Sequence, residues 1–106
     1  MELILLTVPE CPNAAAFSER LTDALAGRPG ITVVRREVAD DVVAAQSGMH
    51  GSPTLLIDGN DPFATRGQVT SLSCRLYPDE SGRPGPAPSV ESLRQAIDAA
   101  GDSLLG

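Results

Sequence analysis

The sequence predicts an α/β fold, with one mixed four-stranded sheet flanked by three helices. Three observations support this prediction. In the first half, segments rich in apolar and β-branched residues alternate with segments of helical pattern. Two more segments of strand pattern follow, and an amphipathic segment comes last. The order is β-α-β-α-β-β-α, and its strand–helix–strand start implies a parallel pair with a right-handed crossover. Residues 1–106 are therefore expected to form a single domain.

The first strand and helix meet at a cysteine. Residues 3–8 (LILLTV) have the apolar pattern of a buried strand, and a turn over residues 9–12 follows. The next helix is expected over residues 13–26, with Pro12 suited to its start and Gly27 ending it.

The second strand–helix pair repeats this arrangement on a smaller scale. Residues 31–38 (ITVVRREV) are rich in β-branched side chains and predict a strand. Asp40 or Asp41 can then cap a short helix over residues 42–46. The third strand is expected at residues 54–57, between two turn signals.

A fourth, half-buried strand is expected at residues 71–77, where apolar and polar residues alternate. The residues on its apolar face are Leu72, Cys74 and Leu76. Residues 78–88 are rich in proline and glycine and predict an exposed connector. Ser89 can cap the last helix, which is expected to end near residue 100 and leave a tail at residues 101–106.

Composition restricts the classes of partner. The net charge is −6, and of the eight basic residues only Arg35 and Arg36 are adjacent, so nucleic-acid and anionic-membrane binding are not expected. No apolar run approaches the length of about 18 residues that spans a bilayer, and no basic segment precedes the first apolar run. A cytoplasmic location is therefore expected.

Two cysteines 63 positions apart do not form a disulfide scaffold.

Cys11 is the first candidate for chemistry, because it follows a strand and precedes a helix. Unpaired backbone N–H groups and the macrodipole at a helix N-terminus favour an anion such as a thiolate. Cys74 has two open interpretations: a buried core thiol, or a second reactive cysteine that works with Cys11. His50, the only histidine, is expected to be exposed, and a lone histidine with two distant cysteines is a poor zinc signature.

Two segments resemble the thioredoxin family. Residues 48–56 (GMHGSPTLL) resemble the segment that carries a cis-proline before the third strand, and Pro9-Glu10-Cys11-Pro12 resembles the active-site loop of glutaredoxins. The resemblance implies a thioredoxin-like fold in which Pro53 is cis and Cys11 is the nucleophile. It also implies that Pro12, Ser52, Pro53 and Thr54 bind the substrate.

Three positions depart from that family. Ala14 replaces the second active-site cysteine, Glu10 replaces a common aromatic residue, and Leu5 replaces a buried acid. The expected function is therefore a thiol–disulfide oxidoreductase that works through Cys11 alone. Its thiolate would form a mixed disulfide with an oxidised protein or small-molecule thiol, and Cys74 or a small thiol would resolve it. No bound cofactor or metal is expected, and the chain would be a monomer or a weak dimer.

Two other functions remain open. A second resemblance, carried by the Ser-Pro-Thr-Leu-Leu, Asp-Pro-Phe and Ser-Leu-Ser-Cys-Arg-Leu-Tyr segments, is to small proteins with an alkylmercury lyase label. It implies that Cys11 and Cys74 bind a soft metal and that Glu10 or Asp61 supplies a proton. The other possibility is a thioredoxin-like binding module without catalysis, whose cysteines are structural.

Overall fold

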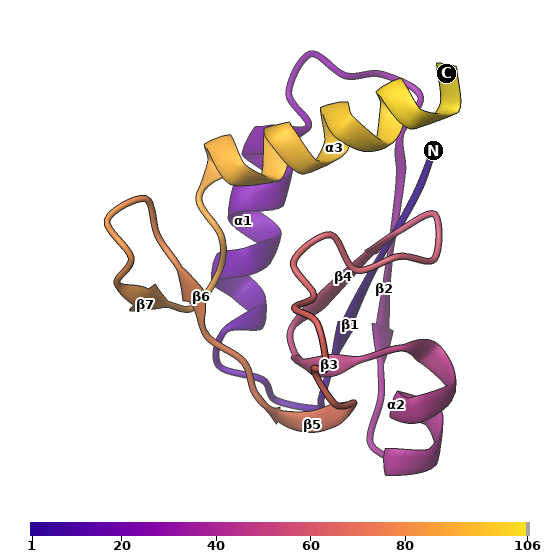
Figure 1. The fold of residues 1–106 in the computed structure, drawn as a ribbon, viewed down its shortest axis with the longest axis vertical. Helices are drawn as coiled ribbons and strands as arrows, with labels where there is room; N and C mark the ends of the chain where they lie inside the picture. The colour runs from indigo at the N-terminus through magenta and orange to yellow at the C-terminus, as the bar shows by residue number, and fades with distance from the viewer. Residues whose placement is uncertain (106) are drawn as a thin grey trace.

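A three-stranded mixed sheet lies at the centre of the molecule (Figure 1), in the computed structural model that describes residues 1–105. Its middle strand is β1 (Glu2–Thr7). β2 (Thr32–Glu37) pairs with β1 in parallel, and β4 (Thr54–Ile57) pairs with it on the other side in antiparallel orientation. The fold is thus α/β, with mixed strand pairing, as predicted.

Three helices pack around this sheet: α1 (Ala14–Ala24), α2 (Asp41–Ser47) and α3 (Val90–Leu105). α1 and α2 begin and end within two residues of their predicted limits. The Asp40 side chain caps α2 by accepting from the backbone N–H groups of Val42 and Val43. α3 continues to Leu105, so most of the predicted tail is helical, and residue 106 lies outside the described residues.

The hydrophobic core has two parts, because side chains of β1 point alternately to the two faces of the sheet. On one face Leu3 and Leu5 pack against α1 and α3, whose largest contribution is the fully buried Phe17. On the other face Leu6 packs with residues of α2 and the segment after it, including Met49. Burial of each such side chain stabilises the fold by about 1.5–3 kcal/mol.

The predicted four-stranded sheet is wrong. Residues 71–77 form two short strands, β5 (Ser71–Cys74) and β6 (Tyr77–Pro78). β5 pairs in parallel with β3 (His50–Ser52), and β6 pairs with β7 (Pro84–Gly85) inside the predicted connector. Neither β5 nor β6 joins the central sheet, so the described residues form one three-stranded and two two-stranded sheets.

The predicted apolar face of residues 71–77 is also wrong. Arg75 and Tyr77 are buried, whereas Cys74 and Leu76 are exposed. Gly51 permits this arrangement, because its φ is +111° and a Cβ there would lie 2.8 Å from the Cβ of Arg75. β5 can therefore approach β3 closely enough to place Arg75 inside the protein.

None of the helices in residues 1–105 is both long enough and apolar enough to cross a membrane.

Candidate functional site

Cys11 lies in a tight turn between β1 and α1. Its backbone N–H donates to the Val8 carbonyl at 3.2 Å, and its own carbonyl accepts from the Ala14 N–H at 3.3 Å. Glu10 closes the turn in the left-handed region, with φ of 59°. The Cys11 side chain is partly exposed and is a free thiol.

Cys74 lies next to this turn rather than in the core. It ends β5, is exposed, and is also a free thiol. The Asn13 side-chain amide donates to Cys74 Sγ at 3.2 Å, which joins β5 to the turn that carries Cys11. Asn13 is the N-cap residue of α1 but makes no side-chain cap hydrogen bond, and its side-chain amide donates to the sulfur. The structural interpretation of Cys74 as a buried core thiol is therefore wrong.

The Ser52–Pro53 peptide bond is cis, as predicted, and it lies beside this site. The Ser52 hydroxyl accepts from the Val8 N–H at 3.0 Å, and the Ser52 carbonyl accepts from the Arg75 N–H at 2.9 Å. Ser52 thus ties the end of β1 to β5. Of the four predicted binding residues, Ser52, Pro53 and Thr54 are buried and only Pro12 is exposed.

A buried polar network behind Cys74 was not predicted. Asp61 has a side chain only 2% exposed, and it accepts from Arg75 Nη1 at 2.7 Å and contacts His50 Nδ1 at 2.8 Å. Arg75 also donates to the Phe63 carbonyl at 2.9 Å and to Thr54 Oγ1 at 3.3 Å. The prediction that His50 is exposed is therefore wrong, because its side chain is 18% exposed.

Tyr77 completes this network. Its ring lies 4.6 Å from the guanidinium carbon of Arg75, and its hydroxyl donates to the Pro53 carbonyl. Burial raises the pKa of the Tyr77 phenol above its usual value, against an opposing effect of Arg75. The only sequence signal for this network is the polar face of residues 71–77, opposite their predicted apolar face. Polar faces normally point to solvent.

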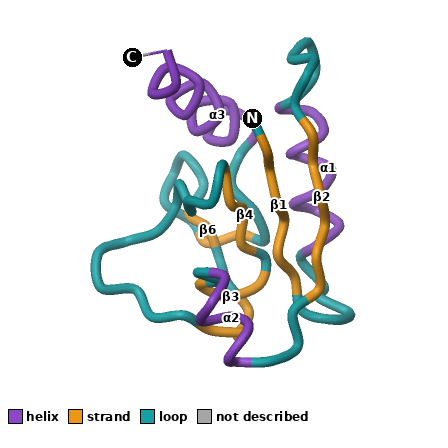
Figure 2. Tube along the Cα trace, turned by 90° about the vertical axis from the view of Figure 1, so that its right-hand side faces the viewer, coloured by secondary structure: helices purple, strands orange, loops and turns teal. Residues whose placement is uncertain are grey.

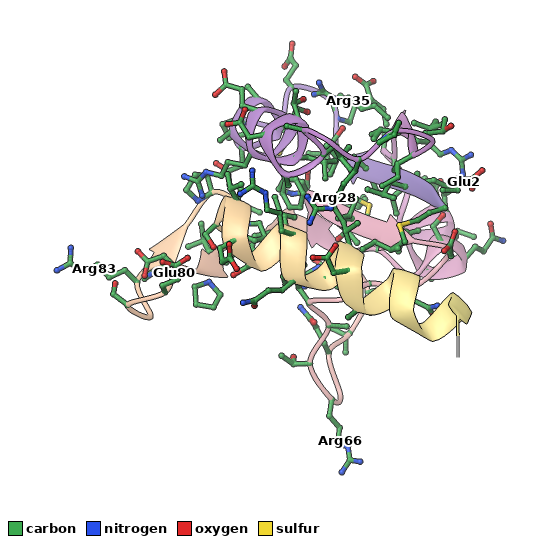
Figure 3. The ribbon with its side chains drawn as sticks, turned by 90° about the horizontal axis from the view of Figure 1, so that it is seen from above. Glu2, Arg28, Arg35, Arg66, Glu80 and Arg83 are labelled. Carbon is green, nitrogen blue, oxygen red and sulfur yellow. The ribbon has the colours of Figure 1, made fainter. Side chains whose placement is uncertain are left out.

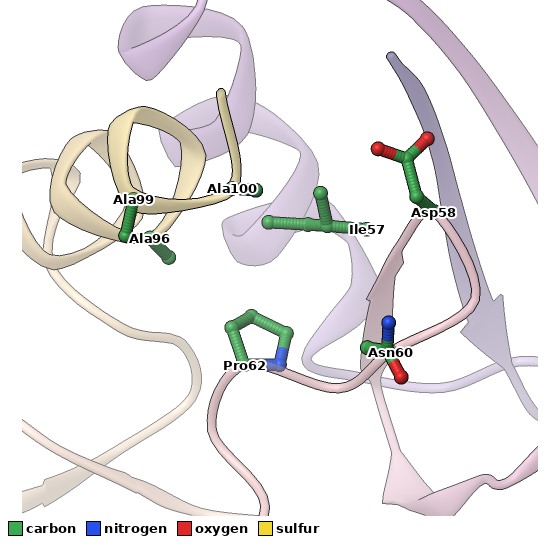
Figure 4. A pocket seen from close by; sticks show the side chains of 7 residues that line it. All are labelled: Ile57, Asp58, Asn60, Pro62, Ala96, Ala99 and Ala100. Atoms are coloured by element: carbon green, nitrogen blue, oxygen red, sulfur yellow. The ribbon is translucent and has the colours of Figure 1, made fainter. Parts of the chain in front are cut away.

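A cavity of about 400 Å³ lies at the other end of the central sheet (Figure 4), between α3 and the turn after β4. Its lining is mostly apolar, with alanines of α3 facing Ile57 and Pro62. Ile57 pairs with Leu3 at the start of β1, whereas Cys11 follows the end of β1. The cavity is therefore separate from the two thiols.

The two thiols are soft donors suited to iron, zinc or copper(I). Among the side chains that the structure describes, no group of three or more histidine, cysteine or acidic residues is placed to hold a metal ion. One copy of this chain thus offers two thiolates, at its surface.

Comparisons with known proteins give relatives of one kind. No family model and no solved structure matches the chain. An iron–sulfur cluster carrier protein of Mycobacterium leprae is 32% identical over 101 residues, which are 95% of this chain and 26% of that protein. Iron–sulfur cluster carrier proteins of Mycobacterium bovis and Mycobacterium tuberculosis are 32% identical over 93 residues, or 88% of this chain and 24% of theirs.

These relatives correct the functional predictions. They are named for an iron–sulfur cluster and not as thioredoxins, so the assignment to the thioredoxin family and the predicted thiol–disulfide oxidoreductase function are wrong. The alkylmercury lyase and non-catalytic thioredoxin-like alternatives are withdrawn for the same reason. The expectation of no cofactor also conflicts with these names. The chain spans about a quarter of the length of these relatives and is similar to them over nearly its whole length.

Proposed function

We propose that this chain takes part in the handling of iron–sulfur clusters, and that Cys11 and Cys74 bind a cluster or its iron as cargo. The observation that carries the proposal is the contact of 3.2 Å between the Asn13 amide and Cys74 Sγ. It brings an exposed thiol on β5 to the turn that presents a second thiol. The names of the mycobacterial relatives supply the identity of the cargo.

The chemistry of the site is consistent with transient binding. Thiolates are the usual protein ligands of iron–sulfur clusters. Because this chain has only two cysteines, thiolates from outside the chain must fill the remaining positions of a bound cluster. A cargo held by two surface ligands can pass to an acceptor whose thiolates replace first the outside thiolates and then Cys11 and Cys74.

The neighbouring residues would shape the site rather than bind the cargo. Ser52, Pro53 and Thr54 are buried, and Ser52 fixes the spacing between Val8 and β5 through its two hydrogen bonds. Pro12 is exposed beside Cys11 and would border the cargo. The Asn13 side-chain amide would donate to a ligating sulfur, an interaction that tunes the stability of such sites.

Anaerobic loading with ferric iron, sulfide and an excess of a small thiol, which supplies the outside ligands and partly reduces the iron, tests the proposal. The wild-type chain should retain iron and sulfide through gel filtration, and Cys11→Ser and Cys74→Ser should each lose most of both. Ser73→Ala is the matched control, since Ser73 precedes Cys74, is exposed, and its hydroxyl makes no hydrogen bond with any group that the structure describes. Equal iron and sulfide contents in the wild type and in the Cys11→Ser/Cys74→Ser double variant would contradict it.

Four broader expectations are part of the proposal. We expect a cytoplasmic protein. The net charge of −6 disfavours binding to nucleic acid and to anionic membranes, and we expect a monomer or weak dimer before loading. Cell fractionation and light scattering test these expectations. The finer topology, a thioredoxin-like arrangement around a central β1, is supported by the parallel β1–β2 pair and the antiparallel β1–β4 pair. A solved structure with β1 at a sheet edge would contradict it.

A further inference from the structure

β2 is an edge strand with its outer side open. It pairs with β1, and no other described strand pairs with it. All six of its residues are exposed, and Val33 and Val34 are 42% and 41% exposed. Figure 2 shows β2 beside β1 at the margin of the sheet, with α1 next to it. An open edge of this kind presents unpaired N–H and C=O groups that can pair with an added strand.

A groove runs beside this edge, between β2 and α1. It has a volume of about 170 Å³ and is lined mainly by apolar side chains, with Arg35 at its border. The apolar residues in the lining are Leu5, Leu21, Leu25 and Val33. Because side chains alternate along a strand, Val33 and Arg35 share the face that borders this groove, and Val34 and Arg36 lie on the other face.

The charge of this edge differs from that of the chain as a whole. The net charge is −6, yet β2 carries the adjacent pair Arg35 and Arg36 against a single acid, Glu37. Arg28 and Arg75 make ion pairs with Asp98 and Asp61. By contrast, the side chains of Arg35 and Arg36 make no ion pair or hydrogen bond with any residue that the structure describes. The two cations are therefore available to carboxylates of a partner.

The same charges select among possible occupants. A second copy pairing edge to edge through β2, in a register that sets Arg35 opposite Arg36, would bring two Arg35–Arg36 pairs together, and like charges across strands are destabilising. A basic or neutral segment would leave the arginines uncompensated. An acidic extended segment with alternating side chains would pair with the backbone edge, place its apolar side chains on the groove face beside Val33, and bring its carboxylates to Arg36 on the other face.

We propose that β2 and the adjoining groove bind an extended, acidic segment of a partner protein by strand addition. The backbone of the segment would supply most of the hydrogen bonds, and its acidic residues would supply the selectivity for this edge. This surface involves neither Cys11 nor Cys74, so the proposal does not depend on the cargo that those residues bind.

The probe for this proposal is a synthetic octapeptide in which glutamate and valine alternate. Binding should shift the backbone amide resonances of β2 and should weaken as salt is added. Arg35→Glu/Arg36→Glu should weaken binding by about tenfold or more, equivalent to about 1.4 kcal/mol. An octapeptide with lysine in place of glutamate, or with N-methyl groups on alternate residues, should fail to bind.

The matched control is Arg66→Glu/Arg83→Glu, which changes the net charge equally. Figure 3 shows these two arginines extending from the body on separate loops. This variant should bind within about twofold of the wild type. An equal loss in both double variants, amide shifts outside β2, or no shifts at about 1 mM peptide would overturn the proposal. Dimers of the wild-type chain that pair through β2 would also overturn it.

Discussion

Asp61→Asn should lower the free energy of unfolding by about 3–5 kcal/mol, because it leaves a buried guanidinium without its counter-charge. The side chains of Asp61 and Arg75 are only 2% and 7% exposed, and they meet at 2.7 Å. Water can therefore solvate Arg75 poorly once the carboxylate is gone. Since small domains are stable by about 5–15 kcal/mol, this loss would be a large share of the total.

Urea unfolding followed by far-ultraviolet circular dichroism measures this loss. With a slope of roughly 1.5 kcal/mol per molar urea, a loss of about 3 kcal/mol moves the midpoint by about 2 M. Asp98→Asn is the matched control, because Asp98 also pairs with an arginine, Arg28, but is 58% exposed. That variant should cost about 0–1 kcal/mol. Similar midpoints for Asp61→Asn and Asp98→Asn would refute the reasoning.

A double-mutant cycle separates the ion pair from the packing around it. Asp61→Leu/Arg75→Met should be more stable than either single variant, because replacing both charges leaves neither one buried alone. If the losses in the free energy of unfolding were additive, the two side chains would contribute independently. That result would contradict an interaction through the short contact between them.

Three other changes follow from single observations. The Thr7 hydroxyl is buried and has no hydrogen-bond partner among the groups that the structure describes. Thr7→Val should therefore raise the midpoint of urea unfolding by removing a cost of about 1–3 kcal/mol, and a lower midpoint would contradict this. Gly51→Ala should lower the free energy of unfolding by about 2–4 kcal/mol, because the new Cβ would lie 2.8 Å from the Cβ of Arg75. Gly27→Ala, where the new Cβ has open space around it, should lower it by about 1–2 kcal/mol. Because burial raises the pKa of Tyr77 above that of the unfolded chain, about 10, stability should fall as pH rises above about 10. Phenolate absorbance should then appear only with unfolding, and its appearance in the folded protein near pH 10 would contradict this.

The helices and strands that are specified by local sequence patterns could be predicted. β1, α1, β2 and α2 begin and end close to their predicted limits, because apolar periodicity, Gly27 and the Asp40 cap act within a few residues. The same local signals did not reveal which strand β5 would pair with, since that depends on the close approach of Gly51 to Arg75.

The candidate site was predicted in part. The position of Cys11 follows from the seam between a strand and a helix, but the position of Cys74 depends on which face of residues 71–77 is buried. Alternation of side chains along residues 71–77 defines two opposite faces but does not say which of them is buried. The apolar face is normally the buried one. Here Arg75 is buried instead, because Asp61, Phe63 and Thr54 supply its acceptors. That inversion turns Cys74 outward.

The family resemblance failed for a different reason. It rested on two short segments around Cys11 and Pro53, which reflect local backbone geometry that unrelated functions can share. The similarity to the iron–sulfur cluster carrier proteins is spread over 93 to 101 residues. The sequence of a local turn does not specify which cargo a protein binds. Two cysteines alone are consistent with several thiol or metal chemistries.

X-ray absorption at the iron edge of the loaded protein tests the central proposal most directly, because it reports the atoms bound to iron. If Cys11 and Cys74 are both ligands, the wild-type chain will show a shell dominated by sulfur. Cys11→Ser and Cys74→Ser will each show added oxygen or nitrogen ligands or retain little iron, while Ser73→Ala matches the wild type. An iron shell that is the same in the wild type and in both cysteine variants would contradict the account.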